Sequence, residues 1–163
     1  MEKENIALLI VDVQRGFITE KTARIPAFVE GLQYKYDTVF ATRFVNLPGS
    51  PYRTLIHWDR MTPGTEDTNL AFTPKPGVAV LEKPVYTCVT DSFLETLRLK
   101  GIDEVHICGI DTDACVTKCA VDLFERGIKP VVLKDYCATT ADEDLQEAAL
   151  AILKRYIGED QVR

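Results

Sequence analysis

The chain alternates between two kinds of hydrophobic pattern along its length. Continuous apolar runs, typical of buried strands, lie at residues 6–12, 37–43, 78–82, 104–109 and 129–133. Apolar residues recur with helical spacing at residues 22–35, 90–100, 113–126 and 141–156. Uninterrupted apolar strands are expected when both faces of a parallel sheet are covered by helices. The pattern therefore predicts an α/β protein: a three-layer, doubly wound, Rossmann-like domain with a mostly parallel sheet.

The length of 163 residues suits one domain, and no linker or internal repeat is visible, so we expect a single domain over residues 1–163. One segment departs from the alternation, because residues 46–77 contain five prolines and three glycines. A connection this long is uncommon inside a domain and is often functional. The segment is either a lid or binding loop on the substrate side, or a partly helical crossover that merely covers the sheet.

Three reactive side chains follow three of the apolar runs: Asp12, Lys83 and Cys115. Taken singly, Asp12 could cap a turn and Lys83 could be a surface lysine. However, ligands of doubly wound sheets bind beyond the carboxyl ends of strands, where the strand order reverses. With the order 3-2-1-4-5, Asp12 and Cys115 would face each other at that point. A thiol with a carboxylate and an ammonium nearby indicates an enzyme that acts through a cysteine.

Cys115 lies near the start of a predicted helix. Thr112 is the predicted N-cap, which places Cys115 at position N3. The helix dipole and the Lys83 charge would both favour the thiolate, so we expect a Cys115 pKa below the reference value of about 8.5. The alternative is that Cys115 is only a small buried hydrophobe on the apolar stripe of the helix.

The five cysteines do not form an obvious disulfide framework, because most of them fall within predicted strands or helices. We expect reduced thiols, with structural roles for Cys88, Cys108 and Cys137. Zinc binding by Cys115 and Cys119 is disfavoured, since neither His57 nor His106 has ligand spacing with them.

The charge of the chain narrows the range of partners. Its net charge is -6 and its pI is about 5.0, and no basic cluster exists to meet phosphates, which disfavours nucleic acid and anionic membranes. No apolar stretch reaches the ~20 residues that span a bilayer, and the first residues do not resemble a signal sequence. We expect a cytoplasmic protein that acts on a small molecule and forms a homo-oligomer.

Two sequence motifs resemble those of a known family. The stretches ALLIVDVQRGF (residues 7–17) and CGIDTDACV (residues 108–116), with Lys83 between them, are similar to the isochorismatase-like cysteine hydrolases. That family includes nicotinamidases, N-carbamoylsarcosine amidohydrolases and isochorismatases, and the likeness extends over essentially the whole chain. The resemblance implies the isochorismatase-like hydrolase fold.

The resemblance also implies roles for individual residues. The family's catalytic triad falls on Asp12, Lys83 and Cys115, and its cis peptide bond falls on Ile110-Asp111. The backbone N–H groups of Asp111 and Cys115 would form the oxyanion hole, and Phe17 and Trp58 would contact the substrate.

The substrate class follows from where the chain departs from its relatives. Metal-binding members carry an Asp-x-His motif and further histidines, whereas this chain has only His57 in that region, so we expect no metal and no cofactor, and nicotinamidase is disfavoured. The complete triad favours hydrolysis of a small amide or ureido substrate through a thioester. The alternatives are an isochorismatase-type vinyl ether hydrolase, or a non-hydrolytic binding or redox thiol protein on the same fold.

Overall fold

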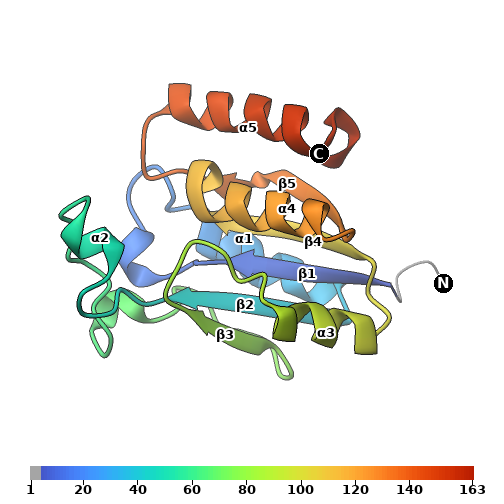
Figure 1. Ribbon diagram of the computed structural model, residues 1–163, viewed down its shortest axis with the longest axis horizontal. Helices are drawn as coiled ribbons and strands as arrows, with labels where there is room; N and C mark the ends of the chain where they lie inside the picture. The colour runs from blue at the N-terminus through green and yellow to red at the C-terminus, as the bar shows by residue number, and fades with distance from the viewer. Residues whose placement is uncertain (1–4) are drawn as a thin grey trace.

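The computed structural model describes residues 5–163, which form one five-stranded sheet (Figure 1). The order of the strands is β3-β2-β1-β4-β5, and every neighbouring pair is parallel. This confirms the predicted doubly wound α/β fold and its 3-2-1-4-5 order. The strands are β1 (Ile6–Val11), β2 (Thr38–Phe44), β3 (Ala79–Lys83), β4 (Glu104–Ile110) and β5 (Lys129–Ala138).

Helices cover both faces of the sheet, with α1 behind it in Figure 1 and α3 and α4 in front. The helix α5 packs against α4. The α-helices are α1 (Ile25–Leu32), α2 (Pro51–Thr54), α3 (Asp91–Leu99), α4 (Thr117–Glu125) and α5 (Glu143–Ile157). Short 3-10 turns lie at Arg15–Phe17, Gln33–Lys35, Glu66–Thr68 and Glu159–Gln161, and a π turn spans Thr112–Val116. None of the helices within residues 5–163 has the length and apolar content of a membrane span.

The core is built around the central strand β1, whose residues from Ala7 to Val11 have no exposed surface. Burial on both faces explains why this strand is a continuous apolar run rather than an alternating one. Side-chain caps fix where two of the covering helices begin: the Thr90 side chain accepts a hydrogen bond at the start of α3, and the Asp142 side chain does so at the start of α5. Gly127, with a φ of 79°, follows the end of α4.

Several element boundaries differ from those the pattern predicts, and two of the differences have a clear local reason. The first helix begins at Ile25 rather than residue 22, and Pro26 lies in its first turn, where proline is favoured because its missing N–H has no helical partner. The last strand continues to Ala138 rather than ending at residue 133, through exposed polar residues after Leu133. The register shift of β4 against β5 lies in this extension, which is why apolar continuity does not reveal it.

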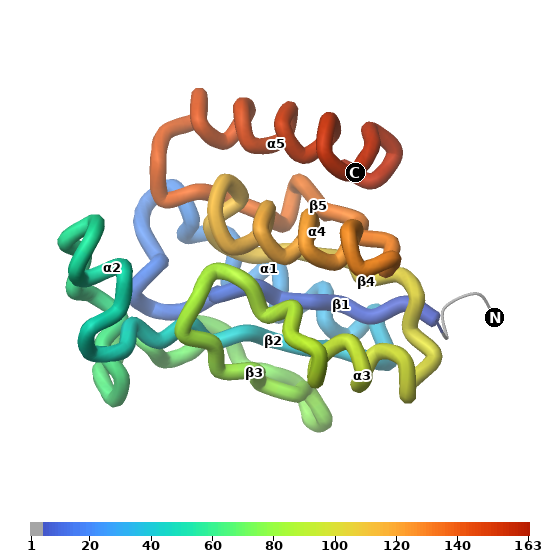
Figure 2. The backbone as a smooth tube through the Cα atoms, in the orientation of Figure 1, coloured from blue at the N-terminus to red at the C-terminus, as the bar shows by residue number. Residues whose placement is uncertain are grey.

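The segment between β2 and β3 folds over the carboxyl end of the sheet, at the left of Figure 2. It contains α2, whose N-cap Ser50 accepts a hydrogen bond from the Arg53 backbone N–H. The Asn46 side chain donates to the carbonyls of Trp58 and Arg60, which ties the two ends of this turn together. The segment is therefore an ordered wall at the edge where the strands end.

Candidate active site

The three predicted reactive side chains meet at the carboxyl end of the sheet. The Lys83 ammonium Nζ lies 2.8 Å from the Asp12 carboxylate Oδ2 and 3.5 Å from the Cys115 Sγ. All three side chains are buried. Asp12 follows β1, Lys83 is the last residue of β3, and Cys115 follows β4, so the topology itself brings them together.

The backbone of Asp12 is held in an unusual conformation by a residue that the sequence pattern does not single out. Asp12 has a φ of 48°, in the left-handed region that aspartate tolerates better than most residues. The Thr42 hydroxyl accepts a hydrogen bond from the Asp12 N–H at 3.0 Å and donates one to the Asp12 Oδ1 at 2.6 Å. Thr42 is one of two threonines in β2, and its position in an apolar run gives no signal of a positioning role.

The Lys83 ammonium is kept charged by its surroundings. Burial alone would lower the Lys83 pKa, but the charge of Asp12 and the hydrogen bond to Asp12 raise it above its ordinary value. The Lys83 Nζ also donates to the carbonyl of Val85 at 3.1 Å and lies 5.2 Å from the centre of the Phe44 ring. Lys83 is thus a fixed positive charge rather than a solvent-exposed side chain.

The helix start at Cys115 differs from the predicted one. The N-cap is Asp111 rather than Thr112, its side chain makes no capping bond, and the first turn is a π turn that places Cys115 four residues after the cap. The Asp111 carbonyl accepts from the N–H groups of Ala114 and Val116. Thr112 is fully buried, and its hydroxyl has no hydrogen-bond partner among residues 5–163. The predicted N3 position for Cys115 is therefore wrong.

The expected depression of the Cys115 pKa is also wrong. Burial raises the pKa of the Cys115 thiol well above its ordinary value, and the nearby Asp12 carboxylate raises it further. The Lys83 charge lowers it but does not offset the other two effects. Cys115 is therefore a protonated thiol at neutral pH, and it needs a base to become a nucleophile.

The residue before the π turn brings a second carboxylate to the site. The Ile110-Asp111 peptide bond is cis, as the family resemblance implies. The Asp111 carboxylate accepts hydrogen bonds from the Thr140 N–H at 2.6 Å and the Thr140 hydroxyl at 3.1 Å. Burial raises the Asp111 pKa to about 6, although the Thr140 hydrogen bonds oppose the shift.

A pocket of about 480 Å³ opens onto Cys115. Phe17 and Trp58, the predicted substrate contacts, both line it, with their rings stacked at 6.2 Å between centroids. The segment 46–77 also contributes to this wall, so it lines the pocket as well as covering the end of the sheet. Sequence reasoning did not identify several other lining residues, which are Thr19, Phe44, Tyr52, Ile56, Arg60, Tyr86 and Thr140.

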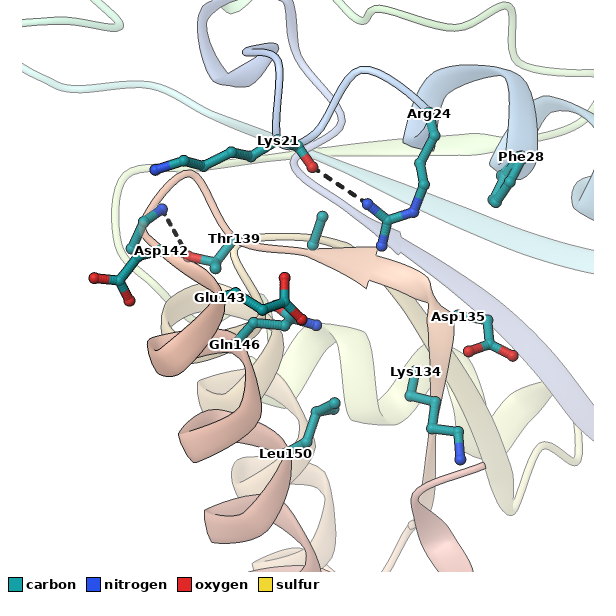
Figure 3. Close-up of a pocket in the computed structure, with 12 residues that line it drawn as sticks. Lys21, Arg24, Phe28, Lys134, Asp135, Thr139, Asp142, Glu143, Gln146 and Leu150 are labelled. Atoms are coloured by element: carbon teal, nitrogen blue, oxygen red, sulfur yellow. Dashed lines mark hydrogen bonds between the residues drawn. The ribbon is translucent and has the colours of Figure 1, made fainter.

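A second pocket, of about 540 Å³, lies beside the start of α5 (Figure 3). Lys21 and Arg24, from the segment before α1, face Glu143 and Gln146 of α5. The Arg24 guanidinium donates to the carbonyl of Lys21 at 3.2 Å, as the dashed line shows. The residues that line this pocket include no cysteine and none of the three reactive side chains, so it is not the candidate active site.

The other cysteines and both histidines lie outside this constellation. All five cysteines are free thiols, and the Cys119 Sγ lies 3.8 Å from the Cys88 Sγ. His106 is bonded to Tyr36 and Glu104, whereas His57 is exposed. No group of three or more His, Cys, Asp or Glu side chains within residues 5–163 is arranged to hold a metal ion. The absence of a metal remains a prediction.

Comparisons with known proteins agree with the motifs. The chain is 36% identical over 89 residues to the ureidoacrylate amidohydrolase RutB of Methylobacterium radiotolerans, which covers 54% of this chain and 34% of that protein. It is 27% identical to a probable isochorismatase of Pseudomonas chlororaphis, across 88% of this chain and 76% of that one. The pyrazinamidase of Pyrococcus horikoshii, solved in complex with zinc, shares the fold with a TM-score of 0.83 at 21% identity, covering 98% of this chain and 97% of that one.

The matches to the ureidoacrylate amidohydrolases span only 34% to 40% of the length of those relatives. The family model of the Isochorismatase domain, in contrast, matches residues 6–159, which is nearly all of this chain. The chain belongs to the isochorismatase family.

Proposed function

We propose that this protein is a cysteine-dependent hydrolase of a small amide or ureido substrate, with Asp12, Lys83 and Cys115 as its catalytic triad. The observation that carries the proposal is the position of the Lys83 ammonium, which contacts both the Asp12 carboxylate and the Cys115 thiol. All three side chains are buried, and Cys115 lines a pocket that is large enough for a small molecule. A purely structural cysteine would have no need for two buried charges beside it.

The triad performs the reaction in two halves. In the first, Asp12 takes the thiol proton while the Cys115 sulfur attacks the carbonyl carbon, and Asp12 then protonates the leaving nitrogen as the C–N bond breaks. In the second, Asp12 removes a proton from water, the hydroxide attacks the thioester, and the proton returns to the Cys115 sulfur. The raised pKa of Cys115 supports this order, since the thiol holds its proton until the substrate is in place.

The negative oxygen of each tetrahedral intermediate needs donors. The backbone N–H groups of Asp111 and Cys115 would supply them, and one such donor is worth about 3 kcal/mol where it has been measured. Phe17 and Trp58 would hold the substrate against the triad, because both line the pocket beside Cys115. Lys83 stabilises the anions that appear in turn on Asp12 and on the sulfur.

The similarity to the ureidoacrylate amidohydrolase supports C–N bond hydrolysis. The similarity to the probable isochorismatase, at lower sequence identity, supports vinyl ether hydrolysis as the competing function. The buried acid/base pair beside the thiol favours the first, because nucleophilic attack by a thiol is a route for acyl carbons and not for vinyl ethers.

The test is a panel of small amides and ureas, assayed for released ammonia with the purified protein. Cys115→Ala should lose at least a thousandfold in turnover, because no second cysteine lines the pocket. Cys137→Ala is the matched control, since Cys137 is also a buried thiol but does not line the pocket. Full turnover by Cys115→Ala would overturn the assignment, and release of pyruvate from isochorismate without any amide turnover would favour the competing function.

We also propose that the protein is a single-domain, cytoplasmic homo-oligomer. Five free, buried thiols suit a reducing compartment. The outer surfaces of α4 and α5 expose large apolar side chains, namely Phe124, Ile152 and Tyr156, which a second copy could cover. Sedimentation equilibrium tests the oligomer, and a monomer at every concentration would contradict it.

A further inference from the structure

The walls of the Cys115 pocket are unusually rich in aromatic rings. Five of its lining residues are aromatic, namely Phe17, Phe44, Tyr52, Trp58 and Tyr86. They form one connected group, because Trp58 lies within 6.3 Å of three of the other rings and Tyr52 lies 5.1 Å from Tyr86. The face of an aromatic ring attracts a cation, and cages of such rings bind ammonium groups. The Phe44 ring already has the Lys83 ammonium 5.2 Å from its centre, so the other four rings are the ones that suit a substrate with a positive charge.

The charged residues that line the pocket also favour a cationic substrate. Only two lining residues carry a formal charge, Arg60 and Asp111. The Arg60 guanidinium is paired with Asp67 at 3.2 Å, and about half of its side chain is exposed, so its charge is screened by solvent. Asp111 is partly buried and has no ion-pair partner among residues 5–163. Its two hydrogen bonds, both from Thr140, leave further lone pairs free.

The position of this carboxylate poses an electrostatic problem for the proposed reaction. Asp111 also supplies one of the two proposed oxyanion donors, so its side chain lies near the place where negative charge develops. An unpaired carboxylate there repels the oxyanion. A cation on the substrate would remove the repulsion, because it would pair with the carboxylate before the oxyanion forms.

We propose that Asp111 determines substrate specificity, and that the substrate is a small amide with a cationic group next to its scissile carbonyl. Asp111 and Thr140 bind the cation from one side, and the aromatic rings enclose it from the other. This inference rests on the proposed hydrolase function and adds to it the charge of the substrate. Ammonium, amidinium and guanidinium groups all have the required chemistry.

Two matched probes isolate the charge. Betaine amide carries a trimethylammonium group next to the carboxamide, and 3,3-dimethylbutanamide is its neutral isostere. We expect kcat/KM of the wild type to be at least tenfold higher for betaine amide than for the isostere. Asp111→Asn should remove this preference by slowing hydrolysis of the cation and by speeding hydrolysis of the neutral isostere, whose oxyanion the carboxylate no longer repels. Asp113→Asn is the control, because Asp113 bonds Thr139 and does not line this pocket.

A binding measurement keeps the test valid whether or not either probe turns over. Betaine amide should protect the Cys115 thiol of the wild type from iodoacetamide at a concentration at least tenfold lower than the isostere requires. Because betaine amide is a permanent cation, its advantage should also decline as the pH falls through about 6 and Asp111 is protonated. Burial raises the Asp111 pKa most, the Thr140 hydrogen bonds lower it, and the charges of Asp113 and Asp12 raise it further.

The outcomes separate this inference from the proposed function. Equal protection by the two probes, or better protection by the neutral one, would overturn the cationic substrate class. Hydrolysis of neutral or anionic amides without a cation preference would overturn it while leaving the hydrolase intact. If no amide or urea is turned over but the cation still protects Cys115 selectively, the proposed function is contradicted. Asp111 would then remain a cation-binding residue.

Discussion

Asp111→Asn should stabilise the fold at neutral and alkaline pH. In the folded protein the Asp111 pKa is raised from 3.8 to about 6, so folding favours the protonated carboxyl. Above pH 6 the folded protein holds an ionised carboxylate that it stabilises less well than the unfolded chain does, so ionisation of Asp111 lowers the stability of the fold. A difference of about two pKa units corresponds to about 3 kcal/mol of lost stability. The loss is present in full above pH 6 and vanishes below pH 3.8.

Asparagine removes the charge and keeps the side-chain oxygen that accepts from the Thr140 N–H. Urea unfolding should therefore show the variant to be about 3 kcal/mol more stable than the wild type at pH 8, and less than about 1 kcal/mol more stable at pH 4. Asp37→Asn, at an exposed position, controls for the loss of an aspartate. A stability difference that is the same at both pH values, or a less stable variant at pH 8, would refute the reasoning. If replacing a site residue makes the protein more stable, that residue is expected to be kept for function rather than for stability.

Two further predictions concern the thiol and the sheet. Lys83→Met removes the charge that lowers the Cys115 pKa, so the thiol should be alkylated by iodoacetamide at least tenfold more slowly at neutral pH; rate-versus-pH curves that overlay the wild type would contradict the role of Lys83. Gly109→Ala should cost more than about 3 kcal/mol in urea unfolding, because Gly109 has a φ of 123° and an added Cβ would lie 2.1 Å from the Val11 carbonyl oxygen. Gly31→Ala is the control, because Gly31 lies inside α1 with open space around it, and it should stabilise the protein by up to about 1 kcal/mol. A similar loss of stability in both variants would show that crowding at Gly109 is not the cause.

The parts of the site that depend on where the strands end can be predicted from the sequence. Continuous apolar runs locate the parallel strands, and the strand order then brings Asp12, Lys83 and Cys115 to one edge before any side chain is placed. The thiol pKa could not be predicted in this way, because the helix start is visible in the sequence and the depth of burial is not. The predicted Thr112 cap failed for a related reason: a π turn and an α turn begin with the same residue pattern.

Partners that lie far apart in the sequence were also invisible to it. Thr140 holds the Asp111 carboxylate from the end of the neighbouring strand, 29 residues further along the chain. Tyr52 and Tyr86 belong to two different connections and meet only in the folded pocket. Neither pairing follows from periodicity or spacing, because each depends on how a loop returns over the sheet.

The outermost position of β3 has a consequence for how the site comes apart. This five-residue strand is bonded to β2 on one side, and no strand within residues 5–163 pairs with its other side. Edge segments with little burial open locally at a lower free energy than the whole fold, and their amide protons exchange sooner. Lys83 lies at the end of that strand, whereas Asp12 and Cys115 follow the central strands β1 and β4. Partial unfolding would therefore remove the ammonium first, and activity would disappear at a denaturant concentration at which the carboxylate and the thiol still face each other.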